Sequence, residues 1–257
     1  MINVLDVPLY DKTIDDAVEA IIADLRSPFA AEANRCISAT GAHGLVEAHK
    51  DANFKTILRH FFMNLPDGMP GVWVGRIKGA KKMKRCYGPD FFKALITATG
   101  GLPVNHFFCG GKEGVASQLK EVCREQFAND RVTGVYCPPF REMTDAEMMA
   151  LGQQIVDSGA HIVWIGLSTP KQEKFAMRLS NFTKTGYIIT VGAAFDFHTG
   201  RVKQAPKWMQ NAGLEWFFRL LMEPQRLYKR YFEIVPKFIW LNIKEFIDFY
   251  IYKKRYI

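Results

Sequence analysis

Short apolar runs alternate with longer helical segments through the first 200 residues, and this alternation limits the fold more than any other feature. Runs rich in β-branched and aromatic residues predict strands at 104–109, 132–136, 161–167 and 187–191, with weaker candidates at 34–38 and 61–65. Helical spacing marks 14–22, 115–127 and 146–158, and a capping box of Thr144 and Glu147 opens the last of these. Strands separated by helices favour a mainly parallel sheet with helices on both faces, so we predict an α/β body over residues 1–200.

The remaining residues, 201–257, form a basic and aromatic segment. They hold 12 Lys/Arg, 5 Asp/Glu and 14 of the 34 aromatic residues, and so carry +7 of the net charge of +8. Apolar residues at helical spacing predict one amphipathic helix around 214–222 and a second that begins near Pro236. Such a segment suits anionic lipid headgroups. Helices that pack on the body and turn their charges to water are an equally good interpretation, and nucleic acid ranks below both.

Several kinds of site and location are not expected. The five cysteines are odd in number and lack C-x-x-C spacing, so free thiols in a reducing compartment are the natural interpretation. The histidine spacing suits no zinc site and no D-x-D pair is present to hold a nucleotide-bound metal, so we expect neither a metal nor another cofactor. Without a secretory signal or an apolar run of about 18 residues, a cytoplasmic protein with no transmembrane helix is expected.

The loops that follow predicted strands should hold the chemistry, because ligands bind beyond the carboxyl ends of parallel strands. In the first loop, Asp67 lies between two prolines and beside a glycine. Pro-Asp-Gly is ordinary turn chemistry, and on local grounds that interpretation wins, although a carboxylate on a rigid loop suits a general base. In the second loop, the backbone at Gly110, Gly111 and Lys112 suits either a phosphate or a tight turn without ligand.

A third loop places Gly166 at a strand exit and gathers polar side chains, Lys171, Gln172 and Glu173, at a helix start. These groups suit hydrogen bonds to a sugar, and helix capping is the alternative. The fourth loop holds Asp196 between two phenylalanines, where a structural carboxylate bonded to backbone amides is at least as good an interpretation as catalysis.

A nucleotide leaving group in a chain without a D-x-D pair would need cations and helix dipoles instead of a metal. The candidate cations are Arg85 with its basic neighbours Lys81, Lys82 and Lys84, together with the cations of residues 201–257.

Taken in order, the loop motifs resemble the WecG/TagA/CpsF family of bacterial glycosyltransferases (glycosyltransferase family 26). Each motif alone is weak, but the ordered set is highly specific and covers most of the chain. The motifs are Pro-Asp-Gly-Met-Pro at 66–70, Arg85 with Tyr-Gly-Pro-Asp at 87–90, Gly-Gly-Lys at 110–112, Pro-Pro-Phe-Arg at 138–141, Gly166 with Pro-Lys-Gln-Glu at 170–173, Val-Gly-Ala-Ala-Phe-Asp at 191–196, Ala-Pro-Lys-Trp-Met-Gln at 205–210, Gly-Leu-Glu-Trp at 213–216 and Glu-Pro-Gln-Arg-Leu at 223–227.

The resemblance implies a Rossmann-like body and an inverting transfer, without metal, from a UDP-sugar to a sugar on a polyprenyl diphosphate. It also implies surface-polysaccharide synthesis at the cytoplasmic face of the membrane, with residues 201–257 meeting the anionic membrane and completing the site. A homo-oligomer is possible, and nucleic acid is not an expected partner. The family roles map to Asp67 as general base, Arg85 as a partner of donor or diphosphate, Gln172 as a sugar or nucleotide contact, and four diphosphate-facing cations: Arg219, Arg226, Lys229 and Arg230.

One position departs from the resemblance. Gly41 stands where many relatives carry Asn. Either Thr40 or His43 supplies the missing contact, or this branch handles a different sugar. Two rival interpretations remain: a nucleotide-dependent oxidoreductase, disfavoured by the absence of G-x-G-x-x-G, and a non-enzymatic basic adaptor that binds the membrane.

Overall fold

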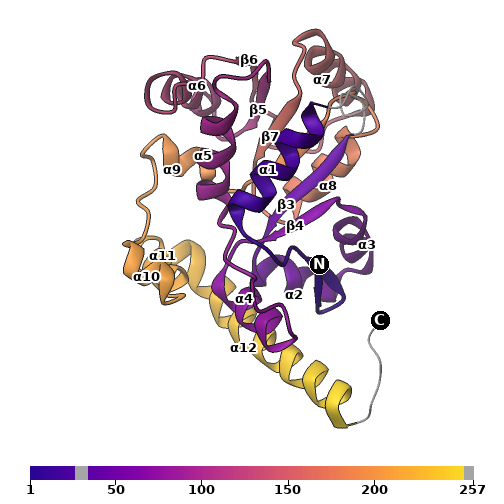
Figure 1. The fold of residues 1–257 in the computed structure, drawn as a ribbon, viewed down its shortest axis with the longest axis vertical. Helices are drawn as coiled ribbons and strands as arrows, with labels where there is room; N and C mark the ends of the chain where they lie inside the picture. The colour runs from indigo at the N-terminus through magenta and orange to yellow at the C-terminus, as the bar shows by residue number, and fades with distance from the viewer. Residues whose placement is uncertain (27–33, 252–257) are drawn as a thin grey trace.

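The computed structural model describes residues 1–26 and 34–251, apart from the side chains of Asn211, Arg226 and residues 249–251. The end of the basic segment, 252–257, and the side chain of the predicted site residue Arg226 therefore lie outside the described part. Figure 1 shows an α/β body with a long C-terminal helix across one end.

A six-stranded sheet forms the centre of the body, and every neighbouring pair of its strands is parallel. Its order is β4-β3-β8-β7-β5-β6. The predicted α/β class and mainly parallel sheet are thus confirmed, and both weaker strand candidates are strands. The bounds are β3 Arg35–Thr40, β4 Met63–Pro66, β5 His106–Gly110, β6 Val132–Tyr136, β7 Ile162–Gly166 and β8 Tyr187–Thr190.

Helices cover both faces of this sheet, and the alternating side chains of the strands build a core on each face. Along β7, Trp164 packs with α1, α5, α6 and α9, whereas Val163 and Ile165 point to the opposite core with α7 and α8. The bounds are α1 Ile14–Leu25, α2 Ala42–Lys50, α3 Ala52–His60, α5 Gly88–Thr99, α6 Val115–Gln126, α7 Asp145–Asp157, α8 Lys171–Leu179 and α9 Ala194–His198. The predicted capping box of Thr144 and Glu147 opens α7.

An N-terminal hairpin, β1 Ile2–Val4 and β2 Val7–Leu9, was not predicted from the sequence. Its strands are only three residues long, too short for a periodic pattern to stand out. Leu5 and Asp6 both take positive φ values at the turn, as two-residue hairpin turns require. The hairpin packs against α3, β4 and α4 (Met69–Ile77), beside the loop that carries Asp67.

The C-terminal segment consists of α10 (Lys207–Asn211), α11 (Glu215–Met222) and α12 (Pro224–Ile251). The prediction of a helix that begins near Pro236 is wrong, because α12 passes through this proline without ending. Pro236 lacks the N–H that would bond four residues back, to the carbonyl of Phe232. Helical structure persists because Ile234, Phe238 and Leu241 are buried with residues of α2, α3 and the hairpin, which favours continuing the helix on both sides of the proline.

Two ion pairs fasten α12 to the body: Lys50 of α2 pairs with Glu233, and Lys78 pairs with Glu245 at 2.6 Å. Figure 1 shows α12 running past α2 and α4. Among the described residues, no helix is long and apolar enough to cross a membrane.

Candidate active site

Asp67 directly follows β4, at the carboxyl end of the sheet. Its backbone N–H donates to the carbonyl of Thr40, 3.2 Å away, which ties it to the end of β3. Its Oδ1 accepts a 2.7 Å hydrogen bond from the N–H of Gly88, the first residue of α5. Its Oδ2 faces Gly41, the N-cap of α2. The carboxylate therefore lies between two helix N-termini, where partial positive charge favours an anion.

The two glycines beside Asp67 differ in the space that they leave. A β-carbon on Gly88 would lie 3.0 Å from the carbonyl oxygen of Val191 and 3.4 Å from Oδ1 of Asp67, so a side chain at this position would require its neighbours to shift. A β-carbon on Gly41 would lie 3.7 Å from Oδ2, an ordinary contact. A side chain at position 41 would thus reach the carboxylate, and glycine leaves that space open.

Three contacts hold Arg85 beside the Asp67 loop. Its Nε donates to the backbone oxygen of Asp67 at 2.7 Å, and its guanidinium pairs with Glu215 of α11. The guanidinium carbon also lies 4.0 Å from the centre of the Tyr87 ring. Arg85 thereby connects the loop after β4 with α11, so the body and the C-terminal segment meet at Asp67.

Burial raises the pKa of the Asp67 carboxyl to about 6, and the nearby Glu215 carboxylate adds to this rise. Arg85, the N–H of Gly88 and Arg219 act in the opposite direction. A carboxylate that titrates near the operating pH combines the deprotonated state with useful basicity. These properties suit the general-base role that the sequence predicts for Asp67.

The predicted diphosphate cations lie on α11 and α12. Arg219 is close enough to influence Asp67, and its guanidinium lies 5.7 Å from the Phe197 ring. No described residue accepts a hydrogen bond from its buried Nε. Arg230 lies near His43 of α2, whose pKa is lowered to about 4 by burial and then by this cation. Lys229 is exposed, with its Nζ 6.0 Å from the Tyr228 ring.

A buried polar cluster lies under the loops that follow β3, β7 and β8. Glu173 accepts hydrogen bonds from Ser38, Thr169 and Gln172, and the Gln172 carbonyl accepts the N–H of Gly192. Gln172, the expected sugar or nucleotide contact, is only 1% exposed. In this structure its side-chain amide forms hydrogen bonds with Thr169, Glu173 and Gly192.

The glycines of the second and third loops bring two strand ends into contact. A β-carbon on Gly110 would lie 2.6 Å from the carbonyl oxygen of Gly166, and the N–H of Gly111 donates to that same oxygen at 2.9 Å. A β-carbon on Gly166 would lie 2.7 Å from the Phe195 ring. Close backbone packing thus explains these glycines, and phosphate binding there stays a prediction.

The remaining predicted residues lie around this edge of the sheet. Lys112 and Lys171 are exposed, in the loops after β5 and at the start of α8. Asp196 is half-buried in α9, and its backbone carbonyl accepts the N–H groups of Arg201 and Val202. The 110–112 loop also meets the loop after β6, where Cys137 Sγ lies 3.6 Å from the carbonyl oxygen of Gly111.

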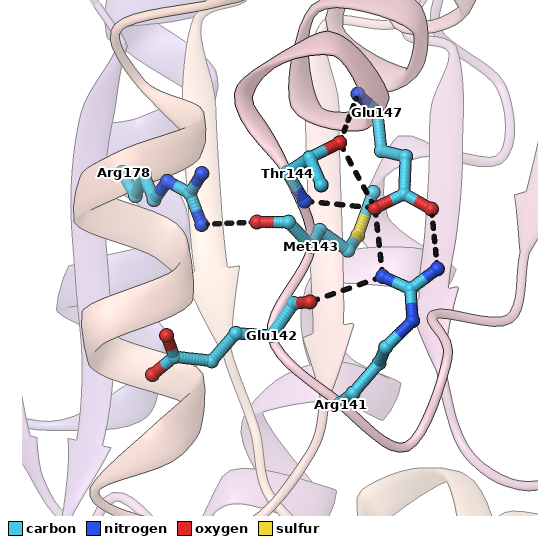
Figure 2. A network of polar contacts seen from close by, with 6 residues as sticks. All are labelled: Arg141, Glu142, Met143, Thr144, Glu147 and Arg178. Carbon is cyan, nitrogen blue, oxygen red and sulfur yellow. Dashed lines mark hydrogen bonds and ion pairs between the residues drawn. The ribbon is translucent and has the colours of Figure 1, made fainter.

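Figure 2 shows how the loop between β6 and α7 is fixed. Arg141 pairs with both carboxylate oxygens of Glu147, at 2.8 and 2.7 Å, and donates to the carbonyl of Glu142. Arg178 of α8 donates to the carbonyl of Met143 at 2.6 Å. The Arg141 charge is therefore balanced by Glu147 in the first turn of α7.

The sequence assigned no individual role to several residues that touch Asp67 or the buried cluster. Gly88 and Glu215 belong to the quoted motifs, so the sequence marked them as important but did not indicate which residues they contact. Ser38 lies within a strand and gave no signal. No group of three His, Cys, Asp or Glu residues in the described part of the chain could hold a metal ion, and the five cysteines are free thiols.

The family model for the glycosyl transferase WecG/TagA/CpsF family matches residues 2–250. The chain belongs to this family. It is also similar to an N-acetylglucosaminyldiphosphoundecaprenol N-acetyl-beta-D-mannosaminyltransferase of Bacillus subtilis (strain 168). The two are 30% identical over 198 residues, which cover 77% of this chain and 75% of the relative. The resemblance read from the ordered motifs is thus confirmed.

Proposed function

We propose that this glycosyltransferase moves a sugar from a UDP-sugar to a polyprenyl-diphosphate-linked acceptor in the synthesis of a surface polysaccharide. The name of the Bacillus subtilis relative supplies the acceptor class, a sugar on a lipid diphosphate. The single observation that carries the chemistry is Asp67, a carboxylate between two helix N-termini with a pKa raised to about 6.

In the proposed reaction, Asp67 accepts the proton of an acceptor hydroxyl as that oxygen attacks the anomeric carbon of the donor sugar. The bond from the anomeric carbon to the UDP oxygen breaks on the opposite face, so one displacement inverts the configuration. General-base catalysis of this kind contributes typically about 10²–10⁴-fold. The buried Nε–H of Arg219, which no described residue accepts, supports recognition of a diphosphate by α11.

Asp67→Asn tests this role, because asparagine keeps the size and the oxygen that accepts the Gly88 N–H. The variant should fold, bind UDP as the native protein does and lose at least about 100-fold in UDP release with a lipid-linked acceptor. Asp157→Asn, which changes an exposed carboxylate in α7, is the control and should leave turnover unchanged. Near-native turnover of a folded Asp67→Asn protein would rule out the general-base assignment.

The donor is best identified by a panel of UDP-sugars tested for protection against thermal unfolding. A ligand at 100 times its Kd adds about 2.7 kcal/mol of stability, which a melting curve resolves. NAD(H) belongs in the panel as the ligand of the oxidoreductase interpretation. Absence of UDP release with every donor would favour the adaptor interpretation, whereas family membership supports the transferase.

We also propose that α11 and α12 hold the enzyme at the cytoplasmic face of the membrane. Large apolar side chains are exposed along these helices, among basic residues: Phe217, Leu221, Met222, Tyr228, Phe232, Ile239, Trp240, Ile243, Phe246 and Ile247. Such a composition suits an interfacial helix on an anionic surface.

Replacing Trp240 and Ile243 by serine tests the membrane contact, since both side chains are more than half exposed and the fold should persist. Burial of two such side chains contributes about 3–6 kcal/mol, so binding to anionic vesicles should fall at least tenfold. Met149→Ser changes an equally exposed residue on α7, at the other end of the body (Figure 1), and should leave binding unchanged. Unchanged sedimentation of the double variant would favour the packing interpretation.

A further inference from the structure

Glu173 is a carboxylic acid buried under the candidate site, at the start of α8, with 1% of its surface exposed. Three donors converge on a single oxygen, Oε1: Ser38 Oγ at 3.1 Å, Thr169 Oγ1 at 2.9 Å and Gln172 Nε2 at 2.8 Å. The other oxygen, Oε2, is buried, and no described residue donates to it. No ion pair with a described Lys or Arg accompanies this acid.

This arrangement favours a protonated acid: Oε2 has neither a donor nor an acceptor among the described residues, and a buried neutral O–H without an acceptor costs less than a buried charge. An ionised carboxylate spreads its charge over both oxygens, and a buried charged oxygen without a donor or cation is strongly disfavoured. In the protonated form, Oε1 is the carbonyl oxygen that accepts three hydrogen bonds, and Oε2 carries the proton. In agreement with this assignment, burial raises the pKa of Glu173 against the opposing effect of its hydrogen-bond donors.

The direction of each hydrogen bond connects Glu173 to the loops around Asp67. Thr40 Oγ1 lies 3.0 Å from Ser38 Oγ, so Ser38 donates to Glu173 while it accepts from Thr40. The Gln172 amide donates to Glu173 and, at 3.3 Å, to Thr169, and its carbonyl accepts the N–H of Gly192 at 3.0 Å. Side chains from β3 and from the segment after β7 thus donate to one acceptor atom, and the loop after β8 is joined to it through Gln172. The fourth end, at Asp67, is bonded to the carbonyl of Thr40.

We propose that Glu173 is a positioning residue which, as an uncharged acid, fixes the loops after β3, β7 and β8 around Asp67. The proposal rests on the proposed function in that Asp67 is taken as the group that these loops serve. Glu173 itself touches no reacting atom in this scheme.

Two substitutions of similar size separate the charge of Glu173 from its acceptor oxygen. Glu173→Gln is neutral and keeps an oxygen at the Oε1 position, so kcat should stay within about threefold of the native value. Glu173→Met removes the acceptor oxygen that three donors share. Since a shift of about 1 Å can cost 100-fold, kcat should fall on the order of 100-fold with KM little changed. Loss of activity in Glu173→Gln as large as in Glu173→Met would overturn the proposal.

Infrared spectroscopy reads the charge state without any activity. At pH 8 Asp67 is ionised, so the carbonyl stretch of a protonated carboxyl group should appear in the native protein and disappear in Glu173→Gln. Its absence from the native spectrum would refute the uncharged acid. If the native enzyme transfers no sugar at all, the proposed function fails, and amide hydrogen exchange at Gly192 still decides the positioning role. Amide exchange at Gly192 should be at least tenfold faster in Glu173→Met and unchanged in Glu173→Gln. If Glu173→Met does not fold, Ser38→Ala takes its place in this comparison.

Discussion

Replacing Asp67, the proposed general base, by asparagine should make the protein more stable at neutral pH. The Asp67 carboxyl has its pKa raised from an ordinary 3.8 to about 6, so ionising it costs more in the folded chain than in the unfolded chain. One pKa unit corresponds to about 1.4 kcal/mol, and the shift of roughly two units therefore corresponds to about 3 kcal/mol. Asp67→Asn removes this cost and keeps the hydrogen bond from the N–H of Gly88.

The pH range of the effect follows from the direction of the shift. Because the folded pKa is higher than the unfolded one, protonated Asp67 contributes fully below about pH 4, and its contribution is lost as the pH rises to about 6. The difference between native protein and Asp67→Asn should be near zero at pH 4 and reach about 3 kcal/mol at pH 8.

Urea unfolding at both pH values measures this difference, provided that the denaturant slope m is the same for both proteins. Asp196→Asn serves as the control, since Asp196 is a half-buried aspartate at the same edge of the sheet. An Asp67→Asn protein that is no more stable than the native one at pH 8 would refute the argument that burial governs this carboxyl.

Three further outcomes are expected. Glu215→Gln removes a carboxylate that raises the pKa of Asp67, so the acidic limb of kcat/KM should move to lower pH, and an unmoved limb would exclude this coupling. Gly88→Ala places a methyl group 3.0 Å from the Val191 carbonyl oxygen and should lower the free energy of unfolding by about 1–3 kcal/mol, with a loss of activity. Gly101→Ala, with nothing within 4 Å of the added methyl group, should leave both stability and activity close to native. Phe238→Ala empties a buried position between α12 and the body and should lower the free energy of unfolding by about 3–5 kcal/mol. Trp240→Ala, on the exposed side of α12, should change the free energy of unfolding little. Equal effects of the two substitutions would contradict the described packing of α12.

The body of the fold could be predicted from the sequence because its signals are local. Buried strands such as β7 read as continuous apolar runs, and helices such as α7 begin with a capping box. The hairpin of β1 and β2 is too short for a periodic signal. The helix start near Pro236 was predicted wrongly because the effect of this proline depends on the burial of Ile234 and Phe238 against α2. The packing of these side chains outweighs one lost hydrogen bond.

The candidate site was only partly predictable, for a related reason. Its members could be found because parallel strands bring their carboxyl ends to one edge, which placed Asp67, Thr40 and the 166–173 loop together. The residues that contact these site members could not be predicted from the sequence. The pairing of Arg85 with Glu215 joins residues 130 positions apart, and Ser38 meets Glu173 across 135 positions. No periodicity or spacing encodes such contacts, so the inward-facing amide of Gln172 is visible only in the folded chain.

These long-range contacts couple Asp67, the proposed base, to the C-terminal segment. Beyond burial, Glu215 and Arg219 are among the groups that set the pKa of Asp67, and both lie on α11. Glu215 also holds Arg85, whose Nε binds the backbone of Asp67. Removal of α11 would take away both the Glu215 carboxylate and the Arg219 cation and would release Arg85 from its ion pair. A chain cut before Leu214 should therefore show a changed pKa of Asp67 even if the sheet remains folded. An unchanged pKa in that shortened chain would show that the body alone determines the base.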